Sequence, residues 1–438
     1  MTVHFARDRS FWDRMGRAVV IGLLAGLAAI AFTQLVRIGT DLVWPEEVNY
    51  DWLGGEWWWV VVLGVTGFIV GTMRVVLKVP DDLSGSLTIL RESAVDRSTA
   101  LQAIAVSVVS LVGGSSLGPF DGGIRSGAMV GDWYATIRRL PEEEKEVATF
   151  TGINGSLAGL LTAPILATLL ATELRWPERR DYYRRLLPAL TAALFGFALN
   201  FALVGDTFLG VFALPDFGVR FWHFGLAIVL GVLAASVSWL MGITVFYLRR
   251  YLVPLVKNQI VRSTIGGLAL GVIAMTVPLT LASGKGQMSF AIGNVEALGA
   301  GLLIVVVLAK ILALSLSLAT GFIGGPVMPS LFIGGVSGLA VHAIFPEIPI
   351  ALAFSAMLVA VPAVSVGAPF SMVLLAGLTV GTGAVNAAVA GVAVVTAYNL
   401  TAGMGWFGLP AANTTVDIDE ATVQAEIFTV SEEGLDPE

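Results

Sequence analysis

The chain has 438 residues, of which 56% are hydrophobic and 13% are charged, and its mean hydropathy is +0.83. These values lie far outside the range of soluble globular domains and indicate a protein of the lipid bilayer. Cysteine is absent, which excludes disulfide frameworks, cysteine-based metal sites and cysteine nucleophiles. The formal charge of -7 owes much to the tail from about Thr415 to Glu438, which carries acids and no Lys or Arg.

The N-terminal segment, residues 1–17, is rich in arginine and leads into the first apolar run with no small-residue cleavage site. The positive-inside rule therefore predicts that it lies in the cytoplasm. The same rule places the basic stretches Arg175–Arg185 and Arg249–Arg262 in the cytoplasm, and the stretch Gly205–Phe221 outside. We expect a multi-pass protein of the cell membrane with both termini in the cytoplasm.

Short loops separate a series of apolar segments, so the chain is expected to form one all-α integral membrane domain over residues 18–410. An acidic tail, residues 411–438, follows it. The segments begin near Ala18, Trp57, Ala100, Ala148, Leu187, Phe224, Ile265, Leu298, Ile348 and Met372.

Two of these runs are broken by glycine and proline at the depth of the membrane, around Gly113–Gly123 and Gly321–Pro329. Backbone that is not helical is tolerated at that depth only where it is buried in protein or lines an aqueous path. Any single glycine is better explained by close helix packing. The clustering of the glycines indicates function.

The two halves of the chain, about 18–185 and 224–400, repeat the same landmarks. In the first half, the apolar run that starts at Val19 lies about 145 residues before the Ala-Pro pair at Pro164. In the second half, the apolar run that starts at Phe224 lies about 145 residues before the Ala-Pro pair at Pro369. Each half carries a glycine-rich break followed by proline and a small-residue helix. Paired broken helices in duplicated halves are typical of transporters, and they direct their positive N-terminal ends at an anion near the midplane.

Three segments resemble the CLC family of chloride channels and chloride/proton antiporters, and the resemblance extends to about Tyr398. LSGSL, residues 83–87, resembles the family's GSGIP loop; GGSSLGPFDGGIRSGA resembles the GxEGP segment; GGPVMPSLFIGG resembles the GxFxP segment. The resemblance implies an inverted-repeat bundle of many tilted and broken helices, and a homodimer in which each subunit has its own pore. It implies small anions and lipid as partners, no nucleic acid, no metal and no cofactor besides the transported anion.

The anion path that the resemblance implies is lined by the three segments. Serine hydroxyls and backbone N–H groups at helix N-termini can hold chloride weakly enough to release it. Ser84 or Ser86 would contact the ion, although either could instead cap a helix. The path residues are Ser84, Gly85 and Ser86, then Gly118, Pro119, Phe120, Asp121 and Gly122, then Gly325, Pro326, Val327 and Met328.

The sequence departs from the family pattern where the antiporters carry proton-linked carboxylates. Phe120 stands in place of the gating glutamate, so Asp121 either substitutes for it, caps the helix or pairs with Arg125 one turn on. At the second carboxylate Leu174 occupies the site and Glu173 falls one position early, where a helix-end ion pair is the simpler interpretation. Proton coupling is therefore not expected.

Three further positions carry predictions from the resemblance. Pro326 has no N–H to offer the ion, which leaves Val327, Met328 and a helix beginning at Pro329. Tyr398 is the candidate for the family's coordinating tyrosine. Lys310, within an apolar run, either serves the ion path or holds the fold together.

The sequence thus predicts passive passage of chloride or a similar small anion. The alternatives are a CLC-like membrane protein that does not conduct and another inverted-repeat secondary transporter. An intramembrane enzyme is disfavoured, because the three histidines are scattered and no catalytic motif is present. We also expect no regulation by a soluble nucleotide-binding domain, since the family's paired domain of that kind has no counterpart in the sequence.

Overall fold

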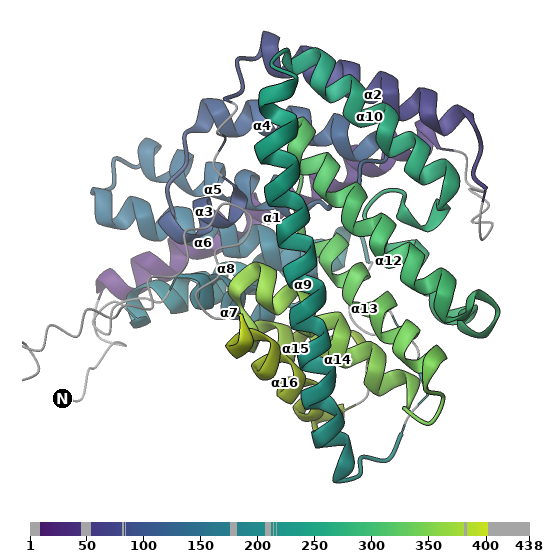
Figure 1. Ribbon diagram of the computed structural model, residues 1–438. Helices are drawn as coiled ribbons and strands as arrows, with labels where there is room; N and C mark the ends of the chain where they lie inside the picture. Colours follow the sequence, from purple (N-terminus) through teal and green to yellow (C-terminus); the bar gives the residue numbers. More distant parts are fainter. Residues whose placement is uncertain are drawn as a thin grey trace, which may run out of the picture.

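In the computed structural model the chain is a bundle of α-helices, described over residues 9–44, 54–80, 83, 85–175, 182–205, 212, 214–215, 217–380 and 383–401 (Figure 1). Eight helices of this described part are long and apolar enough to cross a membrane. The all-α membrane fold predicted from the sequence is confirmed. The tail, residues 411–438, and residues 1–8 lie outside the described residues.

The first half of the chain forms eight helices and the second half forms eight more within the described residues. They are α1 (Arg9–Val43), α2 (Trp58–Val76), α3 (Ser86–Glu92), α4 (Arg97–Val112), α5 (Phe120–Ile137), α6 (Glu142–Leu161), α7 (Pro164–Leu174), α8 (Tyr182–Leu203), α9 (Trp222–Leu255), α10 (Gln259–Thr276), α11 (Lys285–Gly293), α12 (Val295–Thr320), α13 (Val327–Ile344), α14 (Ile350–Pro362), α15 (Pro369–Val380) and α16 (Gly383–Leu400).

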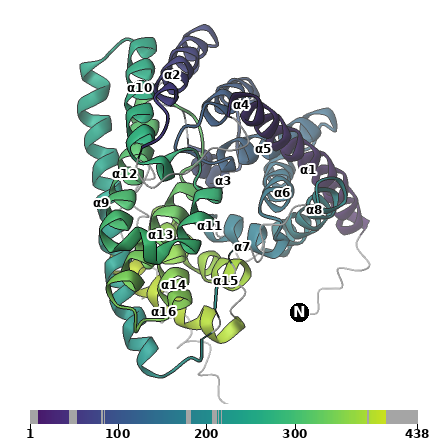
Figure 2. The same cartoon turned by 90° about the vertical axis from the view of Figure 1, so that its right-hand side faces the viewer.

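The two halves lie side by side, and most helices of the first half lie on one side, except α2, which lies beside α10 of the second half (Figure 2). Contacts between the halves include α2 against α10 and α7 against α15. These helices occupy matching places in the two halves, as an inverted repeat requires. Both α7 and α15 begin with a proline that follows an alanine, at the two Ala-Pro landmarks of the sequence.

Small residues set the distance between neighbouring helices. A Cβ atom added at Gly152 of α6 would lie 2.2 Å from the carbonyl oxygen of Gly127 on α5, and one added at Gly267 of α10 would lie 2.1 Å from that of Leu63 on α2. Backbones approach this closely only where no side chain stands between them. This is the packing role that the sequence suggested for most single glycines.

The breaks predicted in the apolar runs are present, and each begins at a glycine with left-handed backbone. Gly114 has φ of +85° just after α4, and Gly321, the C-cap of α12, has φ of +101°. Side chains other than glycine are strained in that region, so glycine ends both helices. The chain then crosses the interior as non-helical backbone before α5 and α13 begin. The most enclosed of the candidate spans are α13, in which 83% of the residues are buried, and Ile350–Gly367, which begins with α14 and in which 89% are buried.

Candidate functional site: the junction of the two broken segments

The two broken segments meet inside the protein. The N–H of Gly118 donates to the carbonyl of Gly325 and the N–H of Gly325 donates to that of Gly118, both at 2.8 Å. Each glycine is followed by a proline that forms the N-cap of an 18-residue helix, α5 after Pro119 and α13 after Pro326. The helices therefore start from one shared point, which we call the junction. The sequence-based expectation that the two segments face each other is confirmed.

The Gly-Pro pairs explain this arrangement. A Cβ atom on Gly118 would lie 2.9 Å from Cβ of Met328, and one on Gly325 would lie 2.9 Å from Cβ of Phe120. The backbones at positions 118 and 325 can approach this closely only because both residues are glycines. Proline fits a helix start because its fixed φ is already helical and the N–H that it lacks would have no intrahelical partner there.

Helix α13 begins at Val327, so the prediction that it begins at Pro329 was wrong by two residues. Pro329 lies in the first turn, where a proline costs no intrahelical hydrogen bond. The first such bond runs from Ser330 N–H to Pro326 O at 3.0 Å. In α5 the equivalent bond runs from Gly123 N–H to Pro119 O, also at 3.0 Å.

Backbone N–H groups ahead of these bonds are the donors that the junction can offer. In α5 they belong to Phe120, Asp121 and Gly122, and in α13 to Val327 and Met328. The helix dipoles add positive partial charge at the same ends. The arrangement suits a small anion without a full positive charge to trap it.

Two serines next to the junction were missed by the sequence reasoning. Ser115 and Ser116 are 0% and 2% exposed, and within the described residues neither hydroxyl has a hydrogen-bond partner. Buried hydroxyls are normally bonded, so these two adjacent exceptions are candidate donors for an ion or a water. The signal was available as the Ser-Ser pair before Leu117-Gly118-Pro119. A third serine, Ser110 of α4, joins the halves by accepting the N–H of Ile323 at 3.2 Å.

Phe120 is buried at the junction, 5% exposed, and belongs to the main hydrophobic core. Asp121 and Arg125 form a buried ion pair one helical turn apart, with Nε to Oδ2 at 2.7 Å and Nη2 to Oδ1 at 3.2 Å. This is the pairing that the sequence offered as the alternative to a gating role for Asp121. Gly122 is tightly enclosed, because a Cβ there would lie 2.1 Å from the ring of Phe32.

The first of the three segments lies beside the second. Ser84 lies outside the described residues. Gly85 is the N-cap of α3 and Ser86 is its first residue, buried at 5% exposure. Helix α3 packs against α5 and α7, so the LSGSL segment approaches the helix that begins at Phe120.

Within the described residues Glu173 forms no ion pair, and the basic residues Arg179 and Arg180 of the adjoining loop lie outside them. The Glu173 carboxylate accepts the N–H of Phe370 at 2.7 Å, and the N–H and hydroxyl of Ser371 at 2.9 and 2.7 Å. It thus caps α15 of the opposite half, because the first turn of that helix presents free N–H groups and positive partial charge. The neighbouring basic residue, Arg175, pairs with Glu146 instead. Leu174 is buried.

Lys310 contacts the loop that is hydrogen-bonded to Gly114, at the start of the first broken segment. It is fully buried, and its Nζ donates to the carbonyls of Thr280 at 2.9 Å and Ala282 at 2.6 Å, 5.0 Å from the ring centre of Phe332. The N–H of Ala282 in turn donates to the carbonyl of Gly114 at 3.0 Å. Lys310 therefore stabilises the loop with Thr280 and Ala282, and this loop in turn holds Gly114 at the start of the broken segment after α4.

Tyr398 lies on α16, which packs against α9, α14 and α15. Its side chain is partly buried. A role for this tyrosine at the ion remains a prediction.

Comparison with known proteins supports the resemblance. A family model described as voltage gated chloride channel matches residues 85–402. The chain is 26% identical over 356 residues to the putative ion-transport protein YfeO of Escherichia coli strain UMN026, covering 77% of this chain and 81% of that protein. It is 27% identical over 350 residues to the chloride channel protein CLC-e of Arabidopsis thaliana, covering 74% of this chain and 48% of that protein.

Solved structures share the fold. A CLC-type fluoride/proton antiporter matches with a TM-score of 0.75 at 19% identity, over 90% of this chain and 96% of that one. A slow cyanobacterial Cl-/H+ antiporter matches with a TM-score of 0.76 at 19% identity, over 93% and 98%.

Proposed function

This chain belongs to the voltage gated chloride channel family, and from that premise we propose that it passes chloride or a similar small anion through the junction, passively and without proton coupling. Members of this family are channels or transporters rather than enzymes, and anion transport is the activity they share. The observation that carries the proposal is the pair of helix starts at Pro119 and Pro326. They lie beside the unbonded, buried hydroxyls of Ser115 and Ser116.

The proposed path uses neutral donors. Chloride that leaves water needs substitutes for its hydration shell, and backbone N–H groups and hydroxyls supply them in a fixed array. Because no lysine or arginine is among these donors, binding stays weak enough for release. Pro326 and Pro329 lower the number of donors on the α13 side, so the α5 side would supply most of them.

Three residues, Phe120, Asp121 and Glu173, support the proposal that transport is not coupled to protons. A phenyl ring at Phe120 cannot carry a proton. The Asp121 carboxylate is engaged by the guanidinium of Arg125, and that of Glu173 is engaged by the N-terminus of α15. Two structural relatives are described as anion/proton antiporters, so coupling is the property to test first.

The test is flux through the purified protein in liposomes. A chloride gradient should drive anion flux while the internal pH stays constant, and a pH gradient should drive no chloride uptake. Asp121→Asn removes a titratable group but keeps a side chain that can accept from Arg125, so it should leave the flux uncoupled as before. Proton movement that follows the chloride gradient and disappears in Asp121→Asn would contradict the proposal. No anion flux under any gradient would instead indicate a member that does not conduct.

We also propose, from the family resemblance, that the chain forms a homodimer in the cell membrane with both termini in the cytoplasm. The start of α1 and the start of α8 lie at the same end of the bundle, because Arg14 and Arg184 both pair with Glu144. This supports placing the first two basic stretches on one side of the membrane. Chemical labelling of single cysteines introduced at the two ends, in a chain that has none, would establish the orientation.

A further inference from the structure

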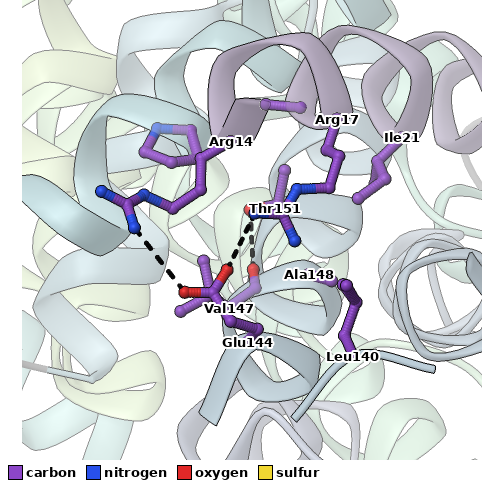
Figure 3. A pocket seen from close by; sticks show the side chains of 10 residues that line it. Arg14, Arg17, Ile21, Leu140, Glu144, Val147, Ala148 and Thr151 are labelled. Atoms are coloured by element: carbon purple, nitrogen blue, oxygen red, sulfur yellow. Dashed lines mark hydrogen bonds and ion pairs between the residues drawn. The ribbon is translucent and has the colours of Figure 1, made fainter. Parts of the chain in front are cut away.

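A small pocket lies where the N-terminal parts of α1, α6 and α8 come together, away from the junction. Its charged rim consists of Arg14 and Arg17 of α1 and Glu144 of α6, and Figure 3 shows the two arginines converging on that carboxylate. Its floor is apolar and includes Ala18, Ile21 and Val147. A site with a charged rim above an apolar floor suits an amphipathic ligand.

The rim carries more positive than negative charge. Glu144 pairs with Arg14 at 3.8 Å, with Arg17 at 3.3 Å and with Arg184 at 2.7 Å, while Arg184 also reaches Glu143 at 3.1 Å. Among the charged residues that line the pocket, two guanidinium groups, those of Arg14 and Arg17, therefore face the one carboxylate of Glu144. Within the described residues the distant contact to Glu144 is the sole interaction of Arg14, and a guanidinium has five N–H donors. The rim can engage a further anion.

The pocket lies at the depth where lipid headgroups are expected. The apolar part of α1 starts at Ala18, directly after the rim, and continues with the exposed side chains Val20, Leu23 and Leu27. Two residues before Arg14, Trp12 is 58% exposed, in the position of an interfacial anchor. A lipid with its headgroup in the pocket could lay its acyl chains along this face of α1.

We propose that the pocket binds the phosphate group of an acidic phospholipid, with Arg14 and Arg17 as its ligands. The two arginines are three residues apart on one helix face, so both guanidinium groups can contact the same phosphate. Glu144 holds them in place from the opposite side. The positive-inside expectation for this end of the protein agrees, since basic pockets between membrane helices on the cytoplasmic side bind acidic headgroups. A soluble phosphate compound has the same headgroup chemistry but would leave the apolar face of α1 unused.

The experiment is a titration of the purified full chain in detergent, followed by native mass spectrometry. Phosphatidylglycerol should bind in preference to phosphatidylcholine with the same acyl chains. In Arg14→Gln/Arg17→Gln, phosphatidylglycerol should bind about thirty-fold more weakly, which corresponds to about 1 kcal/mol for each arginine. Arg14→Lys/Arg17→Lys should retain most of the affinity. Equal binding by the glutamine variant and the wild type would overturn the proposal.

The matched control is Arg37→Gln. Arg37 lies on the same helix, is 64% exposed and pairs loosely with Asp41 at 4.0 Å, so its loss should leave phosphatidylglycerol binding unchanged. If Arg37→Gln loses as much affinity for phosphatidylglycerol as the double variant, the effect is one of overall charge and the proposed site is overturned. Glycerol 3-phosphate should not displace the lipid at similar concentrations; displacement would assign the pocket to soluble phosphates.

A measurement on the wild type keeps the proposal testable should the glutamine variant fail to fold. Phosphatidylglycerol with a photoactivatable group near its phosphate should label peptides from the N-terminal parts of α1 and α6. Labelling that avoids both peptides would overturn the assignment.

Discussion

At the scale of single residues, the junction combines features of a path with features of a packed core. Phe120 takes the place where the resemblance implies a movable carboxylate, yet its ring is 5% exposed and belongs to the hydrophobic core. A bulky ring at the start of a broken helix narrows any path along that helix, and an apolar constriction can exclude water and ions. Its two roles can be separated by experiment.

We expect Phe120→Ala to raise anion flux, because the apolar constriction at the junction is removed. Truncating a buried phenylalanine should also lower the free energy of unfolding by about 3 to 5 kcal/mol. Flux in liposomes and thermal stability are measured on the same preparation, with Phe246→Ala, 58% exposed on α9, as the control. Unchanged flux together with lost stability would assign the ring to packing alone.

Lys310 is a fully buried cation, and its hydrogen bonds in the structure are to carbonyl groups. Lys310→Met keeps the length of the side chain but leaves the carbonyls of Thr280 and Ala282 without this donor. We expect a loss of about 2 to 4 kcal/mol in the free energy of unfolding, at about 1 to 2 kcal/mol for each unsatisfied group. Anion flux should also fall, because Lys310 holds Ala282 in place and the N–H of Ala282 donates to the carbonyl of Gly114 next to the junction.

The control for Lys310→Met is Lys257→Met, at an exposed lysine between α9 and α10. Its effect on thermal unfolding should be small. A Lys310→Met variant that is as stable as the wild type, or more so, would show that burying the charge costs as much as its hydrogen bonds contribute.

At the scale of helices, the ends of short segments connect the two halves. Glu173 at the end of α7 caps α15, while α7 and α15 are themselves equivalent elements that pack against each other. A carboxylate at a helix N-terminus accepts N–H groups and interacts favourably with the dipole. Glu173 thus holds one half of the repeat against the other.

Glu173→Gln should lower the free energy of unfolding by about 1 to 2 kcal/mol, because the amide keeps one acceptor oxygen but loses the negative charge at the N-terminus of α15. The control is Glu296→Gln, at an exposed glutamate in the first turn of α12. Thermal unfolding in detergent measures both. A variant with unchanged stability but altered proton movement would contradict the capping role and return Glu173 to the proton pathway.

At the scale of the whole molecule, the duplication was predictable from the sequence because its signals are local. Glycine and proline mark the breaks and the Ala-Pro landmarks, whatever the rest of the chain does. The meeting of the segments at Gly118 and Gly325 follows from the repeat itself. The start of α13 was missed because two prolines three residues apart, Pro326 and Pro329, are both compatible with a helix start.

The partners of polar side chains were less predictable, because tertiary packing selects them. Nothing near Glu173 in the sequence indicates the N-H groups of Phe370 and Ser371 in the other half. Asp121 and Arg125 were predictable as a pair since their spacing alone brings them together on one helix. The burial of Ser115 and Ser116 depends on how both halves close around the junction, which no local pattern reports.

The junction itself offers the clearest test of the two-half architecture. Gly325→Ala would place a Cβ atom 2.9 Å from Cβ of Phe120 and 3.1 Å from the amide nitrogen of Asp121. One of the two reciprocal hydrogen bonds to Gly118 must then lengthen, which shifts α5 against α13. We expect anion flux to fall to background and the free energy of unfolding to drop by about 1 to 3 kcal/mol.

Gly301→Ala on α12 is the matched control, because a Cβ atom there meets nothing within 4 Å. It should leave flux unchanged, and it should keep or slightly raise stability, since alanine favours a helix over glycine by up to about 1 kcal/mol. Flux and thermal unfolding are compared for both variants in the same lipid. If Gly325→Ala conducts like the wild type, the anion does not pass through the junction. A path bounded by the starts of α5 and α13 would change its flux when these helices shift against each other.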